Sequence, residues 1–281
     1  MDRSLITWVI DTTILRFSAV DLPTKLREAQ IECLEFAHTA TSSPPTLPDL
    51  TGRCVVLYGS IGFNRRIRES GAILIPGNLG NNTNTEVARY MSYLPLDWFL
   101  NRNCLMTTWS VLNARPKEEW QVLFPGTRVF ARPNSGFKTF AGQTINYDKW
   151  QEDLEAIDQV SSVTGETLIV LAPDQELQGE FRFVVADGKV IAGSEYRWDN
   201  VLDIRRDWPE ECFEVAKKVA EHEWQLDIAY TCDVALTPNG SKLIELNGFS
   251  SAGLYACDIN AVIEGITECA WREWSGEDVE L

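Results

Sequence analysis

Apolar and polar positions along this chain follow two periods, one typical of strands and one typical of helices. Short apolar runs bounded by turn residues predict strands at residues 5–10, 54–58, 71–75, 128–131 and 167–171. Apolar residues at helical spacing predict helices at residues 24–37, 86–100, 147–163, 209–223 and 259–274. Short strands that alternate with helices indicate an α/β architecture, with a small α/β layer at the start of the chain.

Two further pairs of apolar runs are joined by turns of the kind that connect antiparallel strands. Residues 179–185 and 189–196 flank Asp187-Gly188, and residues 229–236 and 242–246 flank the sequence TPNGS. Both pairs therefore predict hairpins. Irregular or connecting structure is predicted at residues 41–48, 78–84, 201–207 and 275–281.

The second hairpin carries polar side chains where a strand would align them. Glu245 and Asn247 are two residues apart, so they point the same way in an extended strand. If the hairpin pairs about its turn, Asp233 meets them from the neighbouring strand. Two carboxylates and an amide oxygen on one face form a site for a hard cation such as Mg²⁺ beside phosphates. A surface hairpin whose polar residues face water is the alternative.

Residues 127–142, TRVFARPNSGFKTFAG, combine a strand, a Gly-containing turn and two cations. In such a loop, backbone N–H groups can surround phosphate oxygens while Arg132 and Lys138 neutralise them. An ordinary hairpin with surface cations is the alternative. We expect Phe130, Phe137 and Phe140 to anchor the segment to a core, which would give the cations a rigid base.

The first hairpin contributes a carboxylate and two arginines. Glu180 and Arg182 share one face of its first strand, and Arg197 ends the returning strand. With the apolar strand at residues 167–171, these groups would suit the ribose, phosphates and adenine of a nucleotide. A cross-strand salt bridge is the alternative for the arginines.

Composition narrows the classes of function. The net charge of −16 disfavours general binding to nucleic acid, and no apolar run approaches the roughly 20 residues needed to span a bilayer. Seven scattered cysteines without a CxxC pair favour free thiols in a reducing compartment, so we expect a cytoplasmic protein. Two histidines exclude a His-rich metal centre, and Cys104 has no neighbouring His that would activate it.

The order of these segments resembles an ATP-grasp domain. A basic strand and loop with a lysine are followed by an apolar strand, GEFRFVVADGKVIAGSEYR, DVAL and LIELN, over residues 127–255. Arg132 stands where most of the superfamily has lysine, which resembles the clade named for an arginine–lysine exchange. The resemblance implies an α/β (α+β) fold with two subdomains that grip ATP between antiparallel sheets. It implies a pre-grasp α/β domain at residues 1–110 and the grasp domain at residues 111–281.

The resemblance also implies roles for single residues. ATP would be contacted by Arg132, Lys138, Glu180 and the backbone near Ala172. Arg182 would bind phosphate and Arg197 the γ-phosphate or an acyl phosphate. Mg²⁺ would be held by Asp233, Glu245 and Asn247. The segment at residues 248–253 would lie beside the acceptor substrate.

The implied activity is an ATP- and Mg²⁺-dependent carboxylate–amine ligase that works through an acyl phosphate. Its substrates would be small-molecule or peptide acids and amines. Two alternatives remain, a regulatory module that only binds ATP and a phosphotransferase. The former would bind ATP without forming ADP, and the latter would form a product stable to hydroxylamine.

Overall fold

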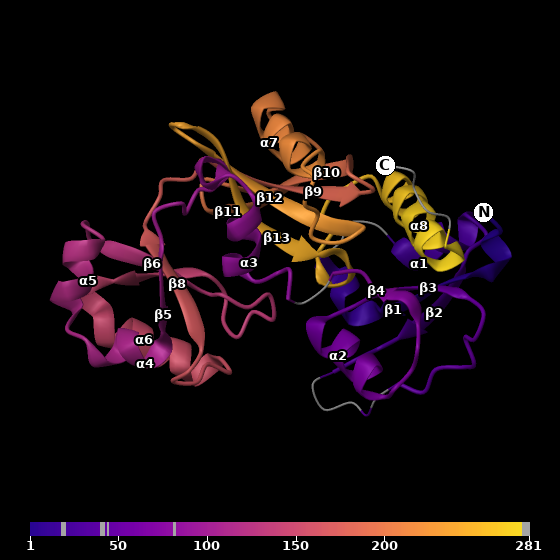
Figure 1. The fold of residues 1–281 in the computed structure, drawn as a ribbon, viewed down its shortest axis with the longest axis horizontal. Coiled ribbons are helices and arrows are strands. Elements are labelled where there is room, and N and C mark those ends of the chain that lie inside the picture. The colour runs from indigo at the N-terminus through magenta and orange to yellow at the C-terminus, as the bar shows by residue number, and fades with distance from the viewer. Residues whose placement is uncertain (18–20, 40–42, 44, 81–82, 277–281) are drawn as a thin grey trace. The chain divides into compact units, whose positions relative to one another are not determined.

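The computed structural model describes residues 1–17, 21–39, 43, 45–80 and 83–276 (Figure 1). Three predicted irregular segments therefore fall partly outside the described residues, at residues 41–42 and 44, 81–82, and 277–281. The chain forms two compact units. The first contains Met1–Asn81 and Leu177–Leu281, and the second contains Asn82–Glu176. The predicted domain division between residues 110 and 111 stays a prediction, because these units are defined by packing alone.

A four-stranded parallel sheet forms the N-terminal layer of the first unit. Its strand order is β2-β1-β3-β4, and its strands are β1 (Ile6–Asp11), β2 (Glu32–Phe36), β3 (Cys54–Tyr58) and β4 (Ile75–Asn78). Every residue of β1 and β3 is buried, as expected of a central strand in a parallel sheet. The predicted small α/β layer is confirmed. The strand predicted at residues 71–75 begins only at its last residue, Ile75.

The helix predicted over residues 24–37 was wrong in its second half. Helix α1 spans Leu22–Glu28, and Gln30, with a φ of 59°, turns the chain out of the helix. Residues 32–36 then pair in parallel with β1 as strand β2. Pairing with a buried neighbouring strand has outweighed the helical periodicity of the local sequence.

Two helices flank this sheet. Helix α2 (Ile61–Glu69) begins directly after β3, where the Ser60 hydroxyl accepts a hydrogen bond from the Phe63 amide at 3.1 Å. Helix α8 (Ile259–Ser275) confirms the predicted closing helix and lies beside α1, although the two are far apart in sequence (Figure 1). Inside the layer, the Trp8 indole donates to the Thr267 hydroxyl of α8 at 3.3 Å.

A five-stranded antiparallel sheet completes the first unit. Its strand order is β11-β10-β9-β12-β13, and its strands are β9 (Gly179–Ala186), β10 (Lys189–Trp198), β11 (Val201–Arg205), β12 (Ala229–Thr237) and β13 (Gly240–Gly248). Both predicted hairpins are confirmed. The connection predicted at residues 201–207 was wrong, because residues 201–205 pair with β10 as the edge strand β11.

The two faces of this sheet differ in chemistry. Phe183 packs against Phe213 of helix α7 (Glu210–Ala220) and against Trp208, with ring centroids 6.2 and 5.7 Å apart. Phe181 and Phe183 lie on that apolar face, as predicted, and both are fully buried. Because successive residues alternate in direction, Glu180 and Arg182 lie on the opposite face.

The end of β13 is held against the N-terminal layer by a close approach of two backbones. A Cβ atom at Gly248 would lie 2.8 Å from the Gly80 Cα, and one at Gly80 would lie 2.3 Å from the Gly248 Cα. Ser250 adds to the attachment: its hydroxyl accepts from the Leu79 amide at 2.8 Å, and its carbonyl accepts from the Gly59 amide at 2.8 Å. The segment after Asn247 is therefore fixed to the parallel sheet.

Replacing Gly248 by alanine should lower the free energy of unfolding by about 2 kcal/mol, since the added methyl group meets backbone that cannot rotate away. The φ of Gly248 is −62°, which any residue adopts, so the expected loss is steric. Chemical denaturation of the two proteins measures it. Gly165→Ala is the matched control, because its nearest neighbour would lie at an ordinary 3.5 Å. Equal losses in the two variants would contradict the steric explanation.

The second unit contains a four-stranded antiparallel sheet of order β5-β8-β6-β7. Its strands are β5 (Leu105–Thr108), β6 (Arg128–Pro133), β7 (Gln143–Asn146) and β8 (Leu168–Pro173). Its helices are α3 (Val87–Tyr93), α4 (Trp109–Ala114), α5 (Lys117–Leu123) and α6 (Trp150–Val160). The predicted core positions Leu154 and Ile157 of α6 are buried in the same cluster as Val129 and Ile169 of the sheet. Among the described residues, no helix is long and apolar enough to cross a membrane.

Candidate functional site

A row of polar residues crosses the five-stranded sheet on the face opposite α7. The strand register places Arg182 of β9 opposite Asp233 of β12, and Asp233 opposite Glu245 of β13. Directly opposed residues on antiparallel strands project from the same face. The expectation that Asp233 meets Glu245 across the hairpin is therefore confirmed, and Arg182 joins them in the same row.

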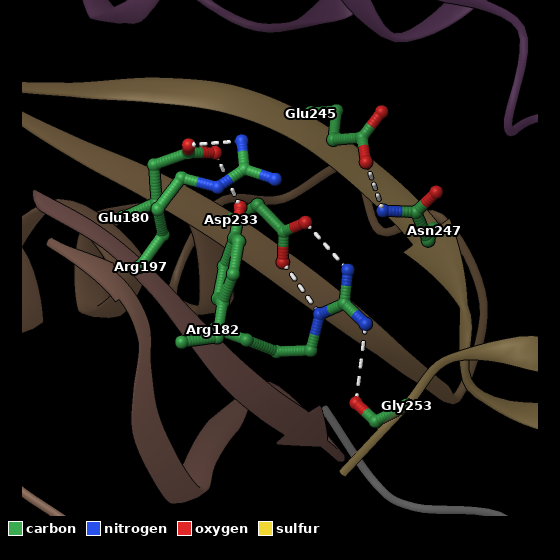
Figure 2. Close-up of polar contacts among 8 residues, drawn as sticks. Glu180, Arg182, Arg197, Asp233, Glu245, Asn247 and Gly253 are labelled. Carbon is green, nitrogen blue, oxygen red and sulfur yellow. Dashed lines mark hydrogen bonds and ion pairs between the residues drawn. The ribbon is translucent and has the colours of Figure 1, made fainter. Parts of the chain in front are cut away.

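Arg182 and Asp233 form a buried, two-pronged ion pair at the centre of this row (Figure 2). The Arg182 Nε donates to Asp233 Oδ1 at 2.7 Å and Nη2 donates to Oδ2 at 2.6 Å, while Nη1 donates to the Gly253 carbonyl at 3.1 Å. The side chains are only 7% and 2% exposed. Burial would lower the pKa of Arg182, but the charge and hydrogen bonds of Asp233 hold it well above its ordinary value.

A second polar cluster lies beside the ion pair, around Glu180. One Glu180 oxygen accepts from Arg197 Nη1 at 2.7 Å, and the other accepts from the Tyr196 hydroxyl at 2.8 Å (Figure 2). The pairing of β9 with β10 shifts by one residue between Glu195 and Arg197, which brings both Tyr196 and Arg197 to Glu180. The structure thus forms the alternative cross-strand salt bridges at both predicted arginines. Arg197 is nevertheless 45% exposed and reaches solvent.

Glu245 and Asn247 lie side by side near the end of β13 (Figure 2). The Asn247 side-chain nitrogen donates to Glu245 Oε1 at 2.9 Å, which leaves the amide oxygen of Asn247 as an acceptor. In the described part of the chain, no three His, Cys, Asp or Glu side chains gather as metal ligands. The predicted set has two carboxylates and one amide, and these oxygen donors on one sheet face fit a hard cation.

In the second unit, Arg132 and Lys138 lie at the two ends of an anchored turn. Arg132 is buried near the end of β6, and Lys138 has a φ of 51° in the connection to β7. Asn134, which sequence reasoning had not singled out, fixes the turn: its side-chain oxygen accepts from the Ala88 amide at 2.8 Å. A Cβ at Gly136 would lie 2.3 Å from Thr85 Oγ1, so the turn packs closely on that residue.

The phenylalanines around this turn do not behave as a group. Phe140 is buried and contacts Trp109 with ring centroids 5.6 Å apart, which confirms it as an anchor. The expectation was wrong for Phe137, which is 40% exposed and leaves the core at the tip of the turn. On β8, Ala172 is fully buried and pairs with Phe130 of β6.

A family model matches residues 99–264, that of the ATP-grasp domain in family 2 of the clade named for an arginine–lysine exchange. The chain belongs to this family. The resemblance and the α/β fold class inferred from the sequence are therefore confirmed. No curated protein gives a match.

Solved structures show the same ATP-grasp fold at low sequence identity. The Bacillus anthracis D-alanine–D-alanine ligase complexed with ATP is 12% identical, with a TM-score of 0.65 over 98% of this chain and 100% of that one. The D-cycloserine synthetase DcsG is 12% identical, with a TM-score of 0.59 over 94% and 99%. The ligase PsnB complexed with a minimal precursor, Mg and ADP is 12% identical, with a TM-score of 0.53 over 96% and 98%.

None of the cysteines of this ATP-grasp protein is a reactive thiolate. Burial raises the pKa of Cys104, and it raises the pKa of Cys33 and of Cys54 to about 12. The pKa of each remaining cysteine is also raised, with burial as the main cause. The expectation that Cys104 has no catalytic role agrees with its protonated state.

Glu195 is a buried carboxylate on the other face of β10, and its Oε1 has no partner among the described residues. Burial raises its pKa, Arg205 opposes the rise, and Asp203 adds to it. A raised native pKa makes the folded protein lose stability as pH rises above the ordinary Glu range. We expect Glu195→Gln to remove this loss, so the variant should be more stable than wild type at about pH 8, by roughly 1 kcal/mol.

The advantage of Glu195→Gln should shrink toward about pH 4, where the wild-type carboxyl is protonated in both states. Thermal unfolding at several pH values measures the difference. Glu118→Gln, at an exposed position of α5, is the control. A stability difference that stays constant between these pH values would contradict a titrating Glu195.

Proposed function

We propose that this ATP-grasp protein is an ATP- and Mg²⁺-dependent carboxylate–amine ligase that forms an amide or peptide bond through an acyl phosphate. The observation that carries the proposal is the alignment of Asp233, Glu245 and Asn247 on one sheet face, beside the exposed guanidinium of Arg197. This face combines ligands for a hard cation with a positive group for phosphate oxygens.

The proposal assigns the nucleotide to residues of known placement in each unit. Arg132 and Lys138 would contact phosphates of ATP from their anchored turn, and the backbone near Ala172 would hydrogen-bond adenine. Glu180 would contact the nucleotide while it orients Arg197, with which it shares a 2.7 Å hydrogen bond. A planar guanidinium and a flexible ammonium are complementary tools for binding one polyphosphate.

Glu245 and Asn247 would hold Mg²⁺ together with Asp233. Each carboxylate oxygen accepts more than one bond, so Asp233 retains acceptor capacity beside Arg182. When bound, the ion would neutralise charge on the phosphate oxygens. We further propose that Arg182 acts as a positioning residue, since its guanidinium is buried and fixes both oxygens of Asp233.

In the proposed reaction, the substrate carboxylate attacks the γ-phosphorus of ATP, and ADP leaves. An amine then attacks the acyl carbon, the amide forms, and inorganic phosphate is released. The half-exposed Arg197 would contact the transferred phosphoryl group and stabilise its charge. Neither step needs a nucleophile from the protein, which agrees with cysteines whose pKa values are all raised.

The test is ADP release from ATP and Mg²⁺, with hydroxylamine as the surrogate amine and pools of carboxylic acids. Acid-dependent ADP together with a hydroxamate would support the ligase and identify the acid. ADP and a phosphorylated product without hydroxamate would favour the phosphotransferase. ATP binding with no ADP from any pool would favour the regulatory module.

We also propose a reducing, cytoplasmic setting and small-molecule or peptide substrates. All seven cysteines are free in the structure, which supports the first proposal. D-alanine–D-alanine ligase, named for an amino acid, and PsnB, solved with a precursor, support the second by analogy of fold.

A further inference from the structure

Tyr255 lies in the segment after β13 with a backbone conformation that aromatic residues rarely adopt. Its φ is 48°, in the left-handed region. The backbone is fixed on both sides of it: the Gly253 carbonyl accepts from Arg182 at 3.1 Å, and the Ala256 amide donates to the Ser194 hydroxyl at 3.1 Å. A strained residue persists only where its surroundings determine its position, and such residues cluster at functional sites.

The fixed backbone places the Tyr255 ring over the centre of the candidate site. The ring stacks on that of Tyr196, with centroids 4.9 Å apart and an angle of 14° between the planes. The Arg182 guanidinium carbon lies 5.2 Å from the centroid of Tyr255 and 5.7 Å from that of Tyr196. The two rings therefore hold the guanidinium that orients Asp233.

The hydroxyl groups of these two rings differ. The Tyr196 hydroxyl is buried and donates to Glu180 at 2.8 Å. The Tyr255 hydroxyl has no hydrogen-bond partner within residues 83–276 or elsewhere in the described chain, and its residue is partly exposed. Burial raises the pKa of Tyr255, and although the charges of Arg182 and Arg197 oppose the rise, the group remains an O–H donor.

We propose that the Tyr255 hydroxyl donates a hydrogen bond to an anionic oxygen of the substrate at this face of the sheet. The two guanidinium groups nearby would attract such an oxygen, and the hydroxyl has no acceptor within the described residues. Two groups of the proposed reaction present this chemistry, the phosphoryl group and the substrate carboxylate. The inference rests on the proposed function for the identity of these groups.

The test compares the wild type with Tyr255→Phe, which keeps the ring and its stacking but removes the donor. Isothermal titration calorimetry in the presence of saturating MgADP would measure binding of inorganic phosphate in one arm and of acetate in the other. We expect binding of at least one probe to weaken about tenfold, as for loss of a hydrogen bond to a charged group. Affinity for MgADP itself should not change.

Tyr93→Phe is the matched control, because it removes a hydroxyl from an exposed tyrosine of α3. Weakening of phosphate alone assigns the hydroxyl to the phosphoryl group, and weakening of acetate alone assigns it to the carboxylate. Equal binding of both probes by wild type and variant, or no binding of either to the wild type, overturns the proposal. If probe binding weakens but no hydroxamate forms with any acid, the ligase fails while this contact stands.

Discussion

Replacing Asp233 by alanine should destabilise the protein by roughly 3–5 kcal/mol, the cost of leaving one charge of a buried pair without its partner. Arg182 would lose two charge-assisted hydrogen bonds of 2.7 and 2.6 Å, and its side chain is only 7% exposed. Because Asp233 holds its pKa well above the ordinary value, the guanidinium stays charged in the wild type. Urea denaturation would measure the loss as a shift in the unfolding midpoint.

The matched control for this prediction is Asp203→Ala, which removes an exposed ion pair with Arg205 on the edge strand. It should change stability little, since exposed pairs contribute little. The double variant Arg182→Met/Asp233→Ala should recover part of the loss, because no unpaired charge remains buried. If Asp233→Ala destabilised the protein no more than Asp203→Ala, the buried pair would not be a determinant of the fold.

Replacing Glu245 by glutamine should lower ATP turnover by at least roughly 100-fold while the protein stays folded. The substitution preserves shape but removes a negative charge from the proposed Mg²⁺ site. Unlike Asp233, Glu245 is partly exposed, so the fold depends less on its charge. ADP release at saturating ATP, followed across a range of Mg²⁺ concentrations, is the measurement, and more Mg²⁺ should be needed for half-maximal rate.

Glu268→Gln, at an exposed position of α8, serves as the control for the Glu245 variant. It should leave both ADP release and the dependence on Mg²⁺ unchanged. Wild-type turnover by Glu245→Gln would remove this residue from the metal site. Loss of turnover together with a lowered unfolding temperature would instead assign it a structural role.

The sequence carried the information for the two hairpins and for the row of residues between them. Turn residues set the pairing of β12 with β13, and the alternation of side chains then determined that Asp233 and Glu245 share a face. The order of motifs was sufficient for the family, because each motif belongs to a different strand or loop of the same fold.

The remaining features depend on contacts between distant segments. Strand β2 follows a helical pattern but is recruited by β1, and edge strand β11 is paired despite its charges. The register shift that turns Tyr196 toward Glu180 interrupts strict alternation, so a period-two pattern does not reveal it. Likewise, no local signal marks Tyr255 or Asn134, whose positions are set by hydrogen bonds to segments far away in sequence.

The composition of the first unit from both ends of the chain has a consequence for synthesis on the ribosome. The Trp8 indole finds its partner Thr267 only 259 residues later, so the N-terminal sheet lacks the α8 side of its core during most of translation. The segment at residues 82–176 emerges earlier as a complete unit with its own core. We therefore expect the middle of the chain to fold first, while the nascent N-terminal strands depend on chaperones until the last helix is released.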